Sequence, residues 1–320
     1  MGTGQHKMMK LILGTMTFSD QVDQHTAQQM LSLFAESGNT ELDTAFQYCG
    51  GRTEELLGAI LPPQQRNKVT IASKVNPWND HGLQPDQVEM QLGEILRRLG
   101  TDYVDLLYLH SPDLDTPVEQ TLERCFEIFQ QGKFKAFGLS NFASWQVAEV
   151  VEICRKNGWM VPTVYQGMYN SLTRDVEREL FPCLRNYGIS FYAYNPLAGG
   201  LLTGKYQSID AIPDSGRFIS KTNYQRRYWK NDYFKVLEKL REACQAAGIK
   251  STTSAMSWLV NHSQLEADKG HGIILGVSKI EHLAENIAAC AEAPLDQSIL
   301  DILDEGWEII KPDCFRYFRP

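Results

Sequence analysis

The sequence predicts a (β/α)8 barrel, the TIM-barrel class, with elaborated loops and an extra C-terminal helix. Short apolar runs alternate with longer segments of helical periodicity, as they do in a parallel sheet wrapped by helices. The apolar runs number eight and are rich in β-branched or aromatic residues, which is typical of strands buried on both faces. Because 320 residues fit one barrel, we expect residues 1–320 to form a single domain with a short lead at 1–9.

The predicted elements follow in chain order. We expect strands at residues 11–15, 41–45, 69–74, 104–110, 134–140, 163–166, 190–194 and 272–277. Outer helices are expected at 24–36, 85–99, 117–131, 145–157 and 176–187, with Pro85 and Pro117 in first turns and Gly38, Gly100, Gly158, Gly188 and Gly248 at helix ends. The alternation breaks at 197–231, a long loop whose aromatic and basic residues favour a functional role, and 296–309 is expected to be the extra helix.

Composition excludes several classes of protein. A net charge of −8 argues against nucleic acid and anionic membranes as partners, although it leaves room for a local basic pocket. We find neither a secretory signal nor an apolar stretch long enough to span a bilayer. The seven cysteines are scattered and form no Cys-x-x-Cys pair, which argues against a disulfide framework or a metal site and favours a cytoplasmic protein.

Four polar residues stand at or just after the ends of predicted strands. Active sites of these barrels lie at the C-terminal ends of the strands, so Asp43, Tyr48, Lys74 and His110 are expected at one mouth. Taken singly, each is more often a loop anchor, an ion-pair partner or a capped loop histidine. Together they indicate proton transfer, because a neighbouring ammonium group would lower the phenol pKa from about 10.

These four residues, with Gly138-Leu-Ser-Asn141, Tyr165-Gln166 and Tyr192-Ala-Tyr-Asn-Pro196, resemble the aldo-keto reductase superfamily over essentially the whole chain. Segments 159–170 and 191–206 and the terminal Tyr317-Phe-Arg319 more narrowly resemble the aflatoxin-aldehyde and succinic-semialdehyde reductases. The resemblance implies NADPH-dependent reduction of aldehydes and some ketones to alcohols. It assigns Tyr48 as general acid, Lys74 as the group that lowers its pKa, Asp43 as the holder of Lys74 and His110 as the residue that orients the carbonyl.

The resemblance also implies where NADPH binds. Ser140, Asn141 and Gln166 match residues that hydrogen-bond the nicotinamide carboxamide, and Tyr194 matches the residue that stacks on the ring; strand-end caps and a core aromatic are the structural alternatives. A small-residue loop offers backbone N–H groups to a pyrophosphate through Asn195, Pro196, Leu197, Gly199, Gly200, Gly204 and Lys205. Gly276, Ser278, Lys279 and His282 open a helix whose N-terminus suits a 2′-phosphate, and Glu285 and Asn286 match the adenine contacts. NADPH is therefore preferred to NADH, although His282 departs from the family, where Arg or Gln is common, and a neutral imidazole is a weaker phosphate ligand.

Substrate selection is expected to depend on two arginines. Arg227, in a basic segment of the long loop, and Arg319, near the C-terminus, form a candidate carboxylate-binding pair; the alternative is that both are solvated surface charges. We therefore predict carboxylated semialdehydes and reactive dialdehydes as substrates, with the tail at 310–320 closing the substrate pocket. Met16 and Trp78 are expected to form part of its apolar wall, or else to be ordinary packing.

Two other functions are alternatives to this one. A regulatory or binding subunit with a nucleotide-bound reductase barrel, like the potassium-channel β subunits, is compatible with the same four polar residues. A metal-dependent barrel hydrolase is disfavoured because the strand ends lack a His-x-His or paired-carboxylate ligand set. The only small-molecule partners expected are the carbonyl substrate and NADPH, and the resemblance alone implies a homodimer.

Overall fold

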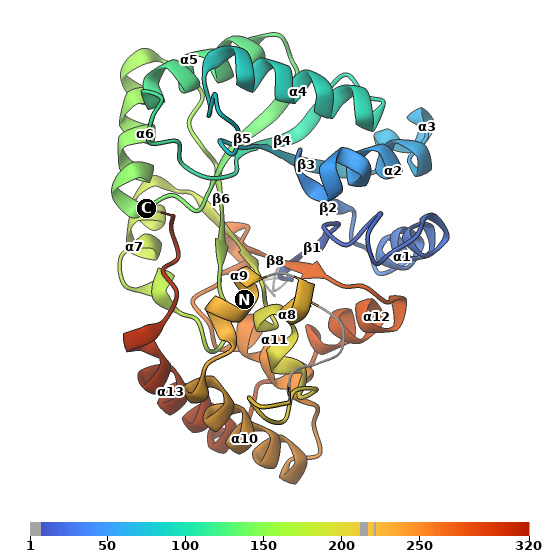
Figure 1. Cartoon of the computed structure of the whole chain (residues 1–320), viewed down its shortest axis with the longest axis vertical. Helices are drawn as coiled ribbons and strands as arrows, with labels where there is room; N and C mark the ends of the chain where they lie inside the picture. Colours follow the sequence, from blue (N-terminus) through green and yellow to red (C-terminus); the bar gives the residue numbers. More distant parts are fainter. Residues whose placement is uncertain (1–7, 212–216, 221, 320) are drawn as a thin grey trace, which may run out of the picture.

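The structure is a computed structural model that describes residues 8–211, 217–220 and 222–319. Its eight parallel strands close into a barrel in chain order (Figure 1). The strands are β1 (Lys10–Gly14), β2 (Glu41–Asp43), β3 (Thr70–Val75), β4 (Val104–Leu109), β5 (Phe134–Ser140), β6 (Val164–Met168), β7 (Ser190–Tyr194) and β8 (Gly272–Gly276). All eight predicted strands and the barrel class are confirmed, with strand ends displaced by no more than two residues.

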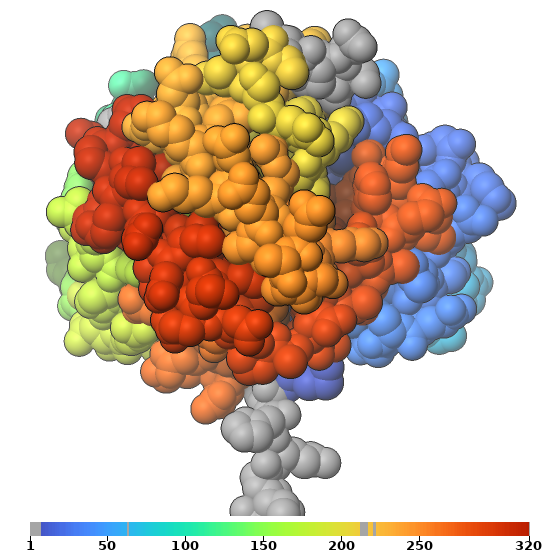
Figure 2. Space-filling model, turned by 90° about the horizontal axis from the view of Figure 1, so that it is seen from below, coloured from blue at the N-terminus to red at the C-terminus, as the bar shows by residue number. Residues whose placement is uncertain are grey.

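The long helices form the outer layer (Figure 1). They are α1 (Gln24–Glu36), α2 (Arg52–Ile60), α4 (Pro85–Leu99), α5 (Val118–Gln130), α6 (Ser144–Asn157), α7 (Leu180–Tyr187), α10 (Asn231–Ala246), α11 (Ser251–Asn261), α12 (Ile280–Ala289) and α13 (Gln297–Ile310). The expected extra helix is α13, which packs beside α10 on the face seen in Figure 2. Among the described residues, no helix combines the length and apolar character that crossing a bilayer requires.

The single helix predicted at 176–187 is wrong. The structure has a 3-10 turn, η2 (Asp175–Glu177), and then α7, which begins at Leu180. Pro182 explains the break, since it has no N–H to donate to residue 178 and its ring would clash with that carbonyl in a continuous helix. Placed in the first turn of α7, Pro182 costs the helix no hydrogen bond.

The long segment at 197–231 contains more regular structure than its sequence indicates. It includes η3 (Ala198–Thr203), α8 (Arg217–Ser220) and α9 (Thr222–Tyr228), and both short helices pack against η3. Residues 212–216 and 221, which belong to the same predicted loop, lie outside the described residues. The segment therefore brings α9 next to the glycine-rich turn that follows β7.

Two apolar layers fix the position of the barrel mouth. The larger layer lies between the strands and the outer helices. The smaller one fills the barrel interior with residues from alternate strand positions, namely Ile12, Ala72, Leu106, Tyr108, Val164, Tyr192 and Ile274. Because side chains fill the barrel interior, a ligand is expected above the C-terminal ends of the strands, where barrels of this class build their sites.

Candidate active site

A buried ion pair joins the ends of β2 and β3. The Lys74 Nζ atom lies 2.8 and 2.7 Å from the two carboxylate oxygens of Asp43, and it also donates to the Thr44 carbonyl at 2.7 Å. The Lys74 side chain is fully buried. Burial lowers the pKa of Lys74, and the adjacent Asp43 carboxylate opposes this shift. This arrangement fits the predicted role of Asp43 as the residue that holds Lys74.

Tyr48 reaches the same ammonium group from the loop after β2. Its hydroxyl lies 3.3 Å from Lys74 Nζ, and the backbone of its loop is tied to β3 by a hydrogen bond from Phe46 N to Lys74 O at 3.1 Å. The predicted lowering of the Tyr48 pKa does not describe this structure. Burial, supported by the negative charge of Asp43, raises the pKa of Tyr48 well above its ordinary value, since both disfavour the phenolate.

His110 follows β4 and faces Tyr48 across the mouth. The two ring centroids are 6.0 Å apart in an edge-on arrangement, and the Trp78 ring lies 4.7 Å from the His110 ring. Burial lowers the pKa of His110 well below its ordinary value, with Lys74 and Arg319 acting in the same direction. His110 is therefore neutral at pH 7, and its buried Nδ1 atom has no partner within the described chain.

A second buried carboxylate lies behind this group, and sequence reasoning missed it. Glu54, on α2, accepts a hydrogen bond from Ser73 at 2.7 Å and pairs with Arg98 at 3.2 Å. Arg98 also donates to the Phe46 carbonyl at 3.0 Å, two residues before Tyr48. The Arg98 guanidinium thus connects α4 to the loop that carries the phenol. Glu54 differs from its neighbour Glu55 only in being buried, and no sequence pattern predicts which of the two is buried.

The residues predicted to meet the nicotinamide lie together at the ends of β5, β6 and β7. Gln166 donates to Asp43 Oδ1 at 2.7 Å, which links it directly to the ion pair. Tyr194 donates to Asn141 Oδ1 at 2.7 Å, and Asn141 Nδ2 donates to the His110 carbonyl at 2.8 Å and to Ser140 at 2.9 Å. These contacts hold the four predicted side chains at the same mouth as Tyr48.

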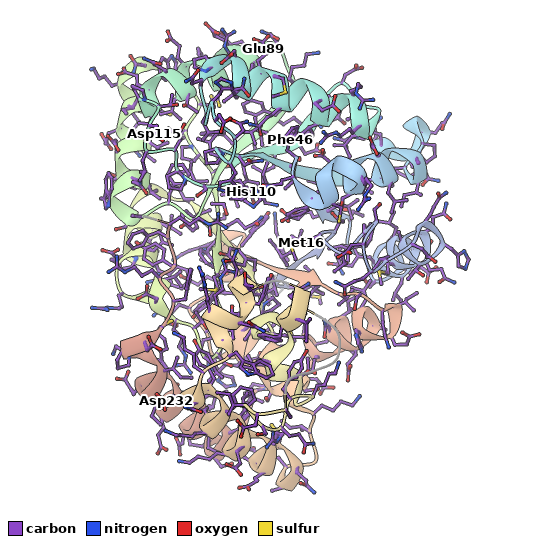
Figure 3. All side chains as sticks on the ribbon, viewed as in Figure 1. Met16, Phe46, Glu89, His110, Asp115 and Asp232 are labelled. Carbon is purple, nitrogen blue, oxygen red and sulfur yellow. The ribbon has the colours of Figure 1, made fainter. Side chains whose placement is uncertain are left out.

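A cavity of about 1390 Å³ opens above these residues. In Figure 3, Met16 and His110 lie near the centre of the molecule, whereas Glu89 and Asp232 lie at its periphery. The lining includes most of the predicted set: Asp43, Tyr48, His110, Ser140, Asn141, Gln166, Tyr194, Asn195, Pro196, Leu197, Gly199, Gly200, Gly204, Lys205, Gly276, Ser278, His282, Glu285, Asn286, Met16, Trp78, Arg227 and Arg319. Lys279 instead lines a smaller depression beside α1, and Lys74 lies beneath the cavity floor.

The cavity also has lining residues that were not predicted. Cationic side chains come from Arg217, Arg241 and Lys250, and the first turn of α11 adds Ser251 and Thr252. Only the basic content of the 197–231 segment hinted at Arg217. The remaining four belong to α10, α11 and the link between them, two helices that were not placed in advance.

The glycine-rich turn after β7 requires glycine at position 199. Its φ of +71° lies in the left-handed region, and a Cβ atom there would come 2.6 Å from the Tyr224 ring of α9. Tyr224 also hydrogen-bonds Asn195 at 3.3 Å. The turn therefore fits closely beneath α9, with its backbone facing the cavity.

The two candidate substrate arginines approach the cavity from different elements. Arg227, on α9, is 9% exposed, and its guanidinium lies 5.0 Å from the Phe315 ring of the tail. The Arg319 guanidinium stacks 4.6 Å from the Trp78 ring centroid. Burial lowers the pKa of Arg319, and the positive charge of Arg227 lowers it further. For Arg227, burial also acts to lower the pKa, but nearby tyrosines outweigh this effect and raise it. Both stay cationic at neutral pH because a guanidinium group keeps its proton in proteins.

Comparison with known proteins agrees with this geometry. The sequence model described as the aldo/keto reductase family matches residues 10–308. Aflatoxin B1 aldehyde reductase member 2 of Homo sapiens is 46% identical over 319 residues, which cover 96% of this chain and 89% of that protein. Aldo-keto reductase family 7 member A3 of Homo sapiens is 44% identical, covering 96% of each chain, and the Mus musculus aflatoxin B1 aldehyde reductase member 2 is 44% identical over 96% of this chain and 87% of its own length.

The predicted family and branch are confirmed by these matches, which extend over the barrel and the polar residues at its mouth. The chain therefore belongs to the aldo/keto reductase family and is an oxidoreductase.

Proposed function

We propose that the protein reduces aldehydes, including carboxylated semialdehydes and reactive dialdehydes, and some ketones, with NADPH as the hydride source and Tyr48 as the general acid. The observation that carries this proposal is the single ammonium group of Lys74 in contact with both Asp43 and the Tyr48 hydroxyl. The names of the relatives, which are aldehyde reductases, support the same activity. They favour it over the alternative of a binding subunit.

The proton is donated by the Tyr48 phenol. Its raised pKa keeps it protonated at neutral pH, so the acid form is available before reaction. As the proton leaves, the positive charge of Lys74, 3.3 Å away, stabilises the phenolate that forms. The low pKa of His110 keeps its imidazole neutral, so it does not compete with Tyr48 as the proton donor. The one N–H group of the neutral ring can still donate a hydrogen bond to the carbonyl oxygen at the same mouth.

The cavity fits a nicotinamide dinucleotide. When bound, such a cofactor supplies the hydride for the carbonyl carbon. The volume of about 1390 Å³ exceeds the roughly 300–1,000 Å³ typical of a drug-sized ligand, which suits an extended cofactor and a substrate together. Ser140, Asn141, Gln166 and Tyr194 would hold the nicotinamide end.

Preference for NADPH is the finer part of the proposal. Ser278 and His282 line the cavity at the start of α12, where backbone N–H groups favour an anion, and Lys250 and Arg241 add positive charge to the lining. Titrations with NADPH and with NADH, followed by quenching of tryptophan fluorescence, test this assignment. Equal dissociation constants for the two cofactors would contradict it.

The carboxylate preference rests on Arg227 and Arg319, which line the same cavity. Guanidinium groups match a carboxylate in shape and charge. Arg319→Ala is expected to raise KM for carboxylated aldehydes and to leave KM for neutral aldehydes nearly unchanged. An equal loss for both classes would refute the pairing of this arginine with the substrate.

The decisive experiment measures NADPH oxidation with 2-carboxybenzaldehyde or succinic semialdehyde in wild type and Tyr48→Phe. This variant keeps the ring and removes the donated proton, so we expect kcat to fall by about 10²-fold or more. A variant as fast as wild type would refute the assignment. We further propose a single-domain, cytoplasmic protein, and a homodimer, which sedimentation of the purified chain would test.

A further inference from the structure

The C-terminal tail packs against the barrel through a buried aromatic residue, Tyr317. After α13 the chain returns towards α6 and α7, where its end lies in Figure 1. Tyr317 is 3% exposed, although its neighbour Arg316 is exposed. Its hydroxyl accepts a hydrogen bond from Ser144 N at 2.9 Å and donates one to Glu179 Oε1 at 2.6 Å. The phenol thus joins the start of α6 to the residue that precedes α7.

Two residues further on, the tail reaches the active site. The Arg319 backbone N–H donates to the Asn141 carbonyl at 3.0 Å, and the Arg319 side chain turns over Trp78. Asn141 belongs to the group predicted to meet the nicotinamide, and it directly precedes the turn into α6. Tyr317 and Arg319 therefore dock on the same loop, one at its far end and one at its active-site end.

Fixing an arginine that approaches from a chain terminus carries an entropic cost. A long side chain on a loose segment must be ordered at each binding event, which weakens binding. Tyr317 supplies buried side-chain contacts that order the end of this tail, because its hydroxyl makes two hydrogen bonds, which add to the backbone bonds from Tyr317 N to Asp175 and from Arg319 N to Asn141. The Asn141 contact uses backbone atoms only, so it does not by itself select the position of the Arg319 side chain.

We propose that Tyr317 is a positioning residue for substrate specificity, which latches the tail so that Arg319 is already placed to receive a substrate carboxylate. This inference rests on the proposed role of Arg319 in carboxylate binding. Tyr317 does not line the cavity, so we expect its effect on anionic substrates and on KM.

The test compares Tyr317→Phe with wild type on a matched substrate pair, 2-carboxybenzaldehyde and benzaldehyde. Phenylalanine keeps the buried ring and removes both hydrogen bonds. We expect KM for 2-carboxybenzaldehyde to rise about fivefold to tenfold with little change in kcat, the scale of one or two lost hydrogen bonds. For benzaldehyde we expect both constants to stay within about twofold.

Two control variants separate the latch from general effects of the tail. Glu179→Gln keeps an amide oxygen that can accept from Tyr317, so most of the selectivity should remain. Arg316→Gln removes an exposed cation of the same tail and should change neither KM nor kcat for either aldehyde. In Tyr317→Phe/Arg319→Ala, KM for 2-carboxybenzaldehyde should be no higher than in Arg319→Ala alone, because the latch acts through Arg319.

The outcomes distinguish the two proposals. If Arg319→Ala discriminates between the two aldehydes and Tyr317→Phe does not, the latch is refuted and the carboxylate site stands. If Arg319→Ala affects both aldehydes equally, the carboxylate site is refuted and the latch with it. If Tyr317→Phe lowers kcat for both aldehydes alike, Tyr317 supports the barrel generally and the specificity role is overturned.

Discussion

Lys74→Met tests the central ion pair most directly. The substitution removes a fully buried ammonium and leaves Asp43, 3% exposed, with the Gln166 amide as a remaining donor. Two unit charges 2.7 Å apart attract by about 6 kcal/mol at an effective dielectric constant of roughly 20. The variant no longer bears the cost of burying the ammonium group, which offsets part of the lost attraction. We therefore expect a net loss of about 3–5 kcal/mol in the free energy of unfolding.

The same variant should lose activity for a different reason. Without Lys74, the phenolate of Tyr48 loses the cation within hydrogen-bonding distance, and its already raised pKa rises further. We expect kcat to fall by about 10²–10⁴-fold, the usual range for an impaired general acid. Urea unfolding followed by circular dichroism measures the first effect, and steady-state NADPH oxidation measures the second.

Lys74→Met/Asp43→Asn separates stability from catalysis. Because both buried charges are gone, this double variant should recover most of the lost stability, as neutral replacements of buried pairs often do. Its activity should stay as low as that of Lys74→Met. The reasoning fails if Lys74→Met loses less than about 1 kcal/mol of unfolding free energy, or if the double variant regains activity. It also fails if the loss in the double variant equals the sum of the losses in Lys74→Met and in the single variant Asp43→Asn.

Three further predictions follow from the packing of single residues. Glu54→Gln removes the buried counter-charge of Arg98, which keeps Glu94 at 2.9 Å, so urea unfolding should show a loss of about 1.5–3 kcal/mol. The kcat should fall more than KM changes, and an unchanged kcat would contradict the link to the Tyr48 loop. Gly58→Ala places a Cβ atom against the Arg98 carbonyl where α2 meets α4. Thermal unfolding should show a loss of about 1–3 kcal/mol in the free energy of unfolding. The control Gly93→Ala, which has open space around the added Cβ atom, should show no such loss. Burial lowers the pKa of His271 from 6.5 to about 4. Below pH 6.5 the unfolded chain therefore binds a proton at this residue that the folded chain does not bind. The free energy of unfolding decreases as the pH falls towards 4. At pH 5 this loss is about 2 kcal/mol relative to pH 8, and it should vanish in His271→Asn, whose amide oxygen can accept from Glu266 N; equal pH dependence in both proteins would refute it.

The strands were predictable because a strand buried on both faces must be apolar along its whole length. That property is local, and it also placed Asp43 and His110, since a polar residue ending such a run lies at the barrel mouth. Helix α2 was missed because only its burial distinguishes it from the loop that carries Tyr48. The break before α7 was missed because helical periodicity continues across Glu179 although Pro182 does not permit the helix to do so.

The Tyr48 pKa shows a different limit of sequence reasoning. The identity of Lys74 indicated an attractive charge, but the opposing effects of burial and of Asp43 depend on how completely the mouth is enclosed. Enclosure is a property of the assembled barrel. Residues that act through it, such as Glu54, are invisible in a sequence until their surroundings are known.

The chemistry and the selectivity of this site are built from parts of the chain with different constraints. Lys74 and Asp43 are fixed by strand register, so moving either one disturbs the barrel itself. Arg319 is placed by contacts with Asn141 and Trp78 across more than half of the sequence, on a tail outside the sheet. Substitutions in that tail can therefore change which aldehydes bind while the proton-transfer geometry stays intact, which is why KM and kcat should respond separately in the variants of Tyr317 and Lys74.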